Sequence, residues 1–110
     1  MFENTKSEII LHTNEVGSIV QCPNCEDLLV KVQNMLYACD INKFNYLHKI
    51  VNYVNENIND HIVEVFNNKC VLICTPNVNI NLTFSKKEFN LLVELFEQSN
   101  HMLNVNELIH

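Results

Sequence analysis

The stretch that decides the fold is Asn34–Val51, NMLYACDINKFNYLHKIV, with a similar stretch 45 residues later at Asn79–Phe96, NINLTFSKKEFNLLVELF. Each begins with Asn, continues as a short apolar strand, and reaches a residue that suits a helix N-cap, Asp40 or Ser85. Four positions later each has Phe, and apolar residues then recur at the spacing of an amphipathic helix. The sequence therefore predicts a strand-and-helix unit that occurs twice.

Strand pairing extends each unit toward the N-terminus. Around a two-residue loop at Gln33-Asn34, segments 28–33 and 35–39 pair so that their apolar residues share one face. In the second half we expect Asn67-Asn68 to form the corresponding turn. That turn predicts one apolar face made of Val63, Val65, Cys70, Leu72 and Cys74. We expect Gly17, the one glycine in the chain, to supply a positive φ in the hairpin before strand 18–22.

Together these elements predict an α+β fold. It consists of antiparallel β-meanders with two helices, built as two similar β-β-β-α units with an extra N-terminal strand. We expect a single domain over residues 1–110, with pseudo-repeats at about 17–58 and 62–99 and a C-terminal tail at 103–110.

The second helix is apolar on two sides. One side carries the core stripe, Phe89, Leu92, Val93 and Phe96. The other carries Leu91, Leu95 and Met102, which must also be buried. Two covers are open. The C-terminal tail folds back over the stripe, or a second copy of the chain packs on it, which makes Leu91, Leu95 and Met102 a candidate homodimer interface.

Composition argues against several classes of partner. The net charge is −6, with seven Lys and no Arg, so neither nucleic acid nor an anionic membrane surface is an expected partner. No apolar run approaches the roughly 18–20 residues that span a bilayer, and the first residues lack the features of a secretory signal. Five cysteines without regular spacing do not resemble a secreted disulfide framework. We therefore expect a cytoplasmic location.

Cys22-Pro23-Asn24-Cys25 is the candidate for metal or redox chemistry. A C-x-x-C turn brings two thiolates to one zinc ion, but a structural site needs two further ligands. Cys70 and Cys74 do not supply them together, because residues four apart on a strand lie roughly 13 Å from each other. A thiol-redox site is a second interpretation, which the acidic residues after the motif disfavour. The third is that both cysteines are partly buried turn residues.

No catalytic constellation is visible in the sequence. The five histidines show no motif spacing, and a chain with one glycine has no Gly-rich phosphate loop. We therefore expect no enzyme but a non-catalytic interaction or regulatory module that has a protein partner or forms a homodimer. Apart from the zinc alternative we expect no cofactor, and the sequence identifies no small-molecule ligand.

Residues 17–44, GSIVQCPNCEDLLVKVQNMLYACDINKF, resemble a small family of uncharacterised bacterial proteins with a domain of unknown function. The shared pattern is G-x-I-V-x-C-x-x-C, two strands joined by a turn, and a capped helix with Phe. The matching positions are Gly17, Ile19, Val20, Cys22, Cys25, Asn34, Asp40 and Phe44. Gln33 and Glu26 depart from it, since the family often has Gly at both positions. The resemblance implies an intracellular bacterial protein and assigns no catalytic or binding residue.

Overall fold

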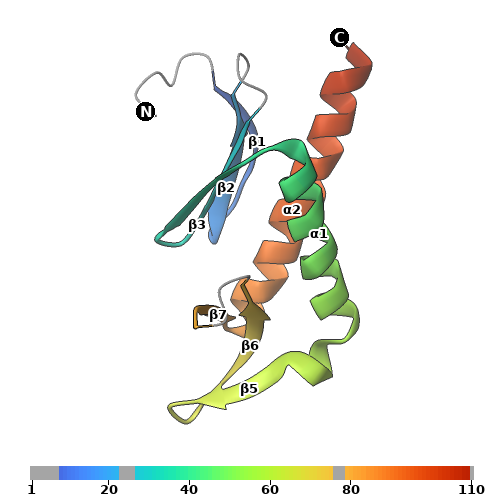
Figure 1. Cartoon of the computed structure of the whole chain (residues 1–110). Helices are drawn as coiled ribbons and strands as arrows, with labels where there is room; N and C mark the ends of the chain where they lie inside the picture. Colours follow the sequence, from blue (N-terminus) through green and yellow to red (C-terminus); the bar gives the residue numbers. More distant parts are fainter. Residues whose placement is uncertain (1–7, 23–26, 76–78, 110) are drawn as a thin grey trace.

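The computed structural model describes residues 8–22, 27–75 and 79–109. Within these ranges the chain forms strands, two α-helices and a short 3₁₀ helix, η2 (Figure 1). In order they are β1 (Ile9–Thr13), β2 (Gly17–Gln21), β3 (Leu28–Val32), β4 (Met35–Cys39), α1 (Ile41–Glu56), η2 (Ile58–His61), β5 (Ile62–Val65), β6 (Asn68–Cys74), β7 (Asn81–Phe84) and α2 (Lys86–Ile109).

The strands form two antiparallel meanders. Sheet A has the order β1-β2-β3-β4, and sheet B has the order β5-β6-β7. A helix follows each sheet, so β2-β3-β4-α1 is succeeded by β5-β6-β7-α2, with β1 as the additional strand. The predicted α+β fold, with two helices and antiparallel meanders, is confirmed.

Both helices begin where the sequence predicts. The side chain of Asp40 accepts a 2.8 Å hydrogen bond from the backbone N–H of Lys43 and so caps α1. Ser85 and Glu88 form a capping box, in which each side chain accepts a hydrogen bond from the other residue's backbone N–H, at 3.0 and 2.8 Å. These bonds satisfy N–H groups that the first helical turn leaves without a partner.

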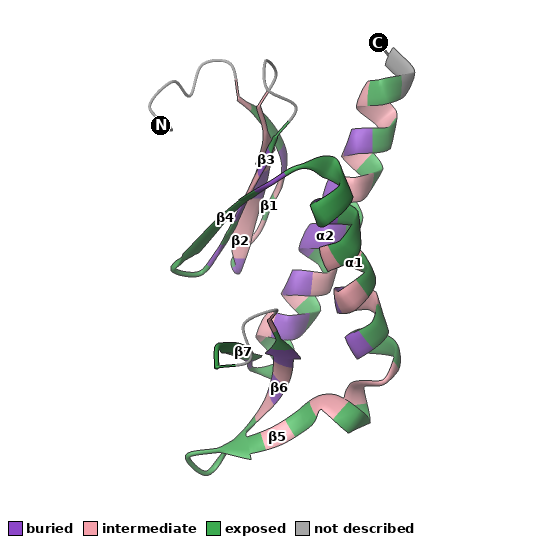
Figure 2. Ribbon diagram, viewed as in Figure 1, coloured by how far each residue is buried: buried purple, intermediate pink, exposed green. Residues whose placement is uncertain are grey.

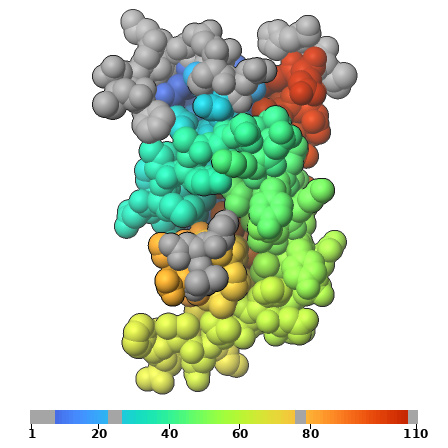
Figure 3. Space-filling view, in the orientation of Figure 1, coloured from blue at the N-terminus to red at the C-terminus, as the bar shows by residue number. Residues whose placement is uncertain are grey.

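Helix α2 holds the two sheets together. Its 24 residues correspond to about 36 Å of helix, which is most of the 46 Å long axis of the molecule. It contacts β1 and β2 of sheet A, β6 and β7 of sheet B, and α1 beside it. Phe44 of α1 and Phe96 of α2 stack with ring centroids 5.4 Å apart. Figure 3 shows the β3–β4 hairpin and α1 side by side, with the β5–β6 hairpin forming the lower end of the molecule.

The C-terminal segment differs from the prediction. Residues 103–109 do not form a tail that folds back, because α2 continues through them to Ile109. Leu103 is buried in the core as part of this helix. The helix continues because Leu103 falls at the helical spacing of Leu92 and Phe96, so it extends the apolar face that packs in the core.

The β3–β4 hairpin has the predicted register. Val32 pairs with Met35, and Leu28 pairs with Cys39 at the other end.

Gly17, in contrast, does not have the expected positive φ. It lies in β2 opposite Val32, where an added Cβ would be 2.0 Å from the carbonyl oxygen of Lys31. The glycine is needed there because two backbones approach closely.

The β5–β6 hairpin turns one residue earlier than predicted. The turn residues are Phe66 and Asn67, with φ of 50° and 68°, instead of Asn67-Asn68. The predicted apolar face, Val63, Val65, Cys70, Leu72 and Cys74, is not the buried one. Val71 and Ile73 are buried instead, paired with Phe84 and Leu82 of β7. Because residues 71–73 are apolar on both faces, their pattern did not decide which face meets α2.

Candidate functional site

Cys22 lies directly after β2 and is disulfide-bonded. Its backbone N–H donates a 2.9 Å hydrogen bond to the carbonyl oxygen of Asp27. Cys25, the other cysteine of the motif, lies outside the described residues. Across residues 8–22, 27–75 and 79–109, no group of three His, Cys, Asp or Glu side chains is arranged to hold a metal ion. Since zinc binds thiolates, a site at Cys22 and Cys25 requires the reduced form, and it stays a prediction.

The remaining cysteines, Cys39, Cys70 and Cys74, are free thiols in three different environments. Cys39 is buried between sheet A and the helices, Cys70 is half-buried, and Cys74 is exposed. Burial, with the nearby carboxylates of Asp40 and Asp27, raises the pKa of the Cys39 thiol to about 11. A neutral buried thiol is neither a nucleophile nor a metal ligand, so Cys39 acts as a small core residue.

The predicted interface stripe on α2 is covered within the chain. Leu95 is 0% exposed, and Leu91 and Met102 are half-buried against the core. The side of α2 that the sequence left uncovered contacts β1 and β2, so sheet A provides the cover. In this conformation Leu91, Leu95 and Met102 therefore do not form a free surface for a second copy.

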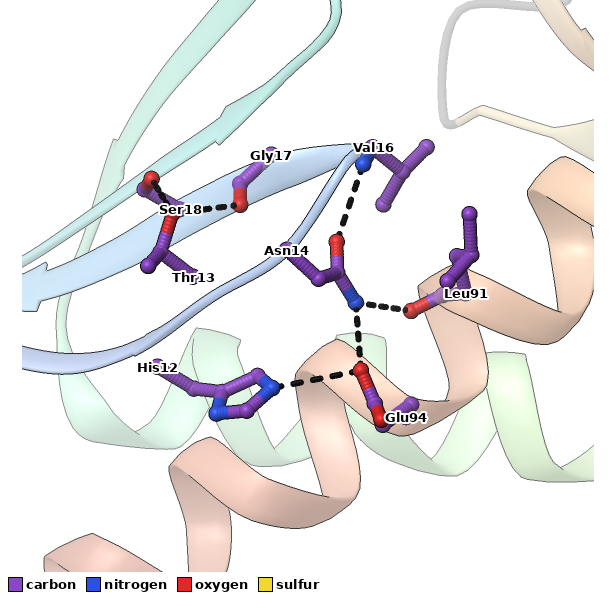
Figure 4. A network of polar contacts seen from close by, with 8 residues as sticks. All are labelled: His12, Thr13, Asn14, Val16, Gly17, Ser18, Leu91 and Glu94. Atoms are coloured by element: carbon purple, nitrogen blue, oxygen red, sulfur yellow. Dashed lines mark hydrogen bonds and ion pairs between the residues drawn. The ribbon is translucent and has the colours of Figure 1, made fainter.

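A polar cluster joins the turn after β1 to α2 (Figure 4). The side-chain amide of Asn14 donates 2.8 Å hydrogen bonds to the carbonyl oxygen of Leu91 and to the carboxylate of Glu94. The carbonyl oxygen of the same side chain accepts a 2.9 Å bond from the N–H of Val16. The Nε2 atom of His12 lies 3.2 Å from the carboxylate of Glu94. These contacts hold sheet A on α2.

A β-bulge places His12 in this cluster. The pairing of β1 with β2 shifts between Ile10 and His12, so Leu11 is an extra residue opposite Ile19. Leu11 is consequently buried while His12 reaches Glu94. The cluster could not be predicted from the sequence, since its members are far apart along the chain and match no motif.

The electrostatics of the cluster suit a structural contact between sheet A and α2 better than a catalytic site. Hydrogen bonds from Asn14 and then His12 lower the pKa of the Glu94 carboxyl. Nucleophilic catalysis would need a hydroxyl or thiol within hydrogen-bond reach of the histidine. The nearby hydroxyls of Thr13 and Ser18 bond to each other at 2.6 Å, and that of Thr13 also bonds to the carbonyl oxygen of Gly17.

Two shallow hollows flank the β3–β4 turn. The larger, of about 460 Å³, is lined by residues 32–35 and 82–84 and has no acid, base or thiol in its lining. The smaller, of about 320 Å³, lies between this turn, the β1–β2 turn and the start of α2. Its titratable side chains are Glu15, Lys87 and Glu88. The carboxylate of Glu88 is engaged by the backbone N–H of Ser85 and by the amide of Gln33, at 2.8 and 2.9 Å.

The outer face of sheet A is the most distinctive surface among the described residues. Side chains alternate across a sheet, and the face that carries Ile19, Leu28 and Val30 is buried, with α2 packed against β1 and β2. In Figure 1 both helices lie on one side of sheet A, and the described chain places no helix on the other side. The strand registers put one apolar residue from each strand in a continuous row on that side, consisting of Ile10, Val20, Leu29 and Ala38.

The two ends of this row are exposed, and Val20 and Leu29 between them are half-buried. Ile10 is 64% exposed, Ala38 is exposed, and Leu36, which shares the face, is 50% exposed. Figure 2 shows β4 exposed along most of its length. The solvated face of an antiparallel sheet is ordinarily polar. An apolar row across four strands is therefore unusual on such a face.

The sequence contains a signal for this surface. The strands LLVKV and MLYAC are apolar at consecutive positions, which is typical of strands covered on both faces. The predicted β3–β4 register already placed Leu29 and Ala38 opposite each other. The whole row could not be predicted from the sequence, because extending it to Ile10 requires knowing the order of all four strands.

No helix in the described part of the chain has the length and apolar character needed to cross a lipid bilayer. In comparisons with known proteins, no family model, no curated protein and no solved structure matches the chain.

Proposed function

We propose that this chain is a non-catalytic protein-interaction module that binds its partner through the outer face of sheet A. The observation that carries the proposal is the row Ile10–Val20–Leu29–Ala38, which crosses four strands on the face opposite α2. Covering such a row stabilises a complex by roughly 25 cal/mol for each Å² of apolar surface removed from water.

The larger described hollow has no acid, base or thiol in its lining, which supports a binding role over an enzymatic one. We place this role in the cytoplasm. Cys39, Cys70 and Cys74 are free thiols and Cys22 is disulfide-bonded, so most of the described cysteines do not belong to the disulfide framework of a small secreted domain.

The test is site-specific photocrosslinking in the native cell. A benzophenone-bearing amino acid replaces Leu36, which is 50% exposed on the outer face, and in a matched control it replaces Tyr46, which is 61% exposed on α1. The proposal predicts a discrete crosslinked species from position 36 and none of comparable yield from position 46. Adding Ala38→Arg to the position-36 protein should remove that species, because the arginine places an unpaired charge in the apolar row.

A different pattern would contradict the proposal. If position 36 yields no discrete adduct, or if both positions yield the same adducts, the outer face of sheet A is not a specific binding surface. The adduct's mass also identifies the partner class, because a second copy doubles the 12.8 kDa mass of the chain.

A further inference from the structure

We propose that the molecule covering the outer face of sheet A is a second copy of this chain, packed face to face about a two-fold axis that runs along the strands. The inference rests on the proposed function, and it adds the identity of the partner and the register of the contact. Two antiparallel sheets commonly pack this way, about 10 Å apart and with their strands roughly aligned.

The distribution of charge favours a second copy at this face. The chain has thirteen acidic residues and a net charge of −6, so two copies repel each other over most of their surfaces. The four strands of sheet A contain no Asp or Glu, and Lys31 is their one Lys. This face offers a charged partner little to pair with, but it lets two acidic chains meet without bringing carboxylates together.

The order of side-chain sizes along the row is self-complementary. An axis along the strands through the middle of the row places Ile10 of one copy over Ala38 of the other, and Val20 over Leu29. The most exposed large side chain of the row thus meets its smallest. Facing large against small residues is how packed layers interdigitate.

The area of the face sets the strength of the contact. Four strands of five residues span roughly 19 by 17 Å, or roughly 320 Å² per copy. Even allowing for surface relief, this is below the about 800 Å² per partner of a standard stable interface. The dimer is therefore weak, and its population rises with protein concentration. Because the copies repel at long range, moderate salt strengthens association by screening.

A charge exchange tests both the partner and the register by sedimentation velocity over a concentration series. Ile10→Glu and Ala38→Arg each place an unpaired charge in the contact, and each should weaken association by about tenfold or more. The two substitutions change the net charge in opposite directions, so a common effect cannot come from overall repulsion. Tyr46→Glu is the control, since Tyr46 is as exposed as Ile10 but lies on α1.

The chain with both substitutions supplies the decisive result. Within one chain, positions 10 and 38 lie three strand spacings apart, about 14 Å, and cannot form an ion pair. In the proposed dimer, each carboxylate faces a guanidinium of the other copy, so the double variant should associate more strongly than either single variant. Circular dichroism confirms that the variants are folded.

Two outcomes would overturn the dimer. One is a wild-type chain that stays monomeric throughout the series. The other is a double variant that associates no better than the single variants, which excludes this register. If, in addition, the adduct from position 36 contains a different protein, the proposed homodimer is wrong, but the proposed role as a protein-interaction module holds. If position 36 gives no adduct, the function fails as well.

Discussion

The side-chain amide of Asn14 donates a 2.8 Å hydrogen bond to the backbone carbonyl oxygen of Leu91, 77 residues further along the chain. The same side chain bonds to Glu94 and accepts a bond from Val16. One residue in the turn after β1 therefore fastens the sheet of the first half to the helix of the second half. This attachment places α2 on one face of sheet A, and no helix of the described residues lies on the opposite face.

Asn14→Ala should lower the free energy of unfolding by about 1–3 kcal/mol, because the Val16 N–H and the Leu91 carbonyl both lose a partner in a partly buried place. Chemical denaturation measures the change. Asn45→Ala, on the exposed surface of α1, is the matched control and should change stability far less. Equal effects of the two substitutions would show that the Asn14 cluster does not hold the sheet to the helix.

Glu94 should make the protein sensitive to acid. Its pKa is lowered in the folded chain by Asn14 and His12, so the carboxylate contributes stability above its ordinary pKa of 4.5, and this contribution is lost as the pH falls through the lowered value. Glu94→Gln should therefore flatten the decline in thermal midpoint over the acid range. Glu64→Gln, in the exposed β5–β6 hairpin, makes the same charge change away from this cluster and is the matched control. Parallel declines in the wild type and Glu94→Gln would argue against the effect.

Gly17→Ala should destabilise the protein by about 1–3 kcal/mol or more, because the new Cβ would lie 2.0 Å from the Lys31 carbonyl oxygen and two strands must move apart. Denaturant titration of the variant gives the value. Glu15→Ala, at an exposed position in the turn before β2, serves as the comparison. A Gly17→Ala protein with wild-type stability would mean that β2 and β3 do not approach as described.

Ser99 in α2 is fully buried, and its hydroxyl has no hydrogen-bond partner among the described residues. Ser99→Ala removes this unpaired group and should raise the free energy of unfolding by about 1 kcal/mol. Ser99→Val removes the hydroxyl too but adds bulk to a packed site, so it should be destabilising. A loss of stability in the alanine variant would indicate that the hydroxyl does have a partner in solution.

The sequence was informative where local pattern and turn chemistry agree. In the β3–β4 hairpin, apolar residues of one strand lie opposite apolar residues of the other. A one-residue shift in register would place them opposite residues of the other face and bring Lys31 and Gln33 among them. The helix starts were also predictable, because Asp40 and Ser85 satisfy the first backbone N–H groups through local contacts.

The predictions failed where contacts with residues far away in the sequence decide which face is buried. Residues 71–73 are apolar on both faces, so only the packing against α2 selects Val71 and Ile73 for the core. The stripe with Leu91 and Leu95 had to be buried, but periodicity does not say what buries it, and the cover is a sheet from the other half of the chain. The predicted zinc ligand Cys25 lies outside the described residues and stays untested.

Methyl NMR spectra of the wild-type protein over a concentration series would show whether the outer face of sheet A is where this chain meets its own copy. We expect the methyl signals of Ile10, Val20, Leu29 and Leu36 to move together as the concentration rises. The signal of Ile62, an exposed residue of β5 in the other sheet, should stay fixed. Shifts at Ile62 with an unchanged outer face, or no shift at any of these residues, would contradict the claim.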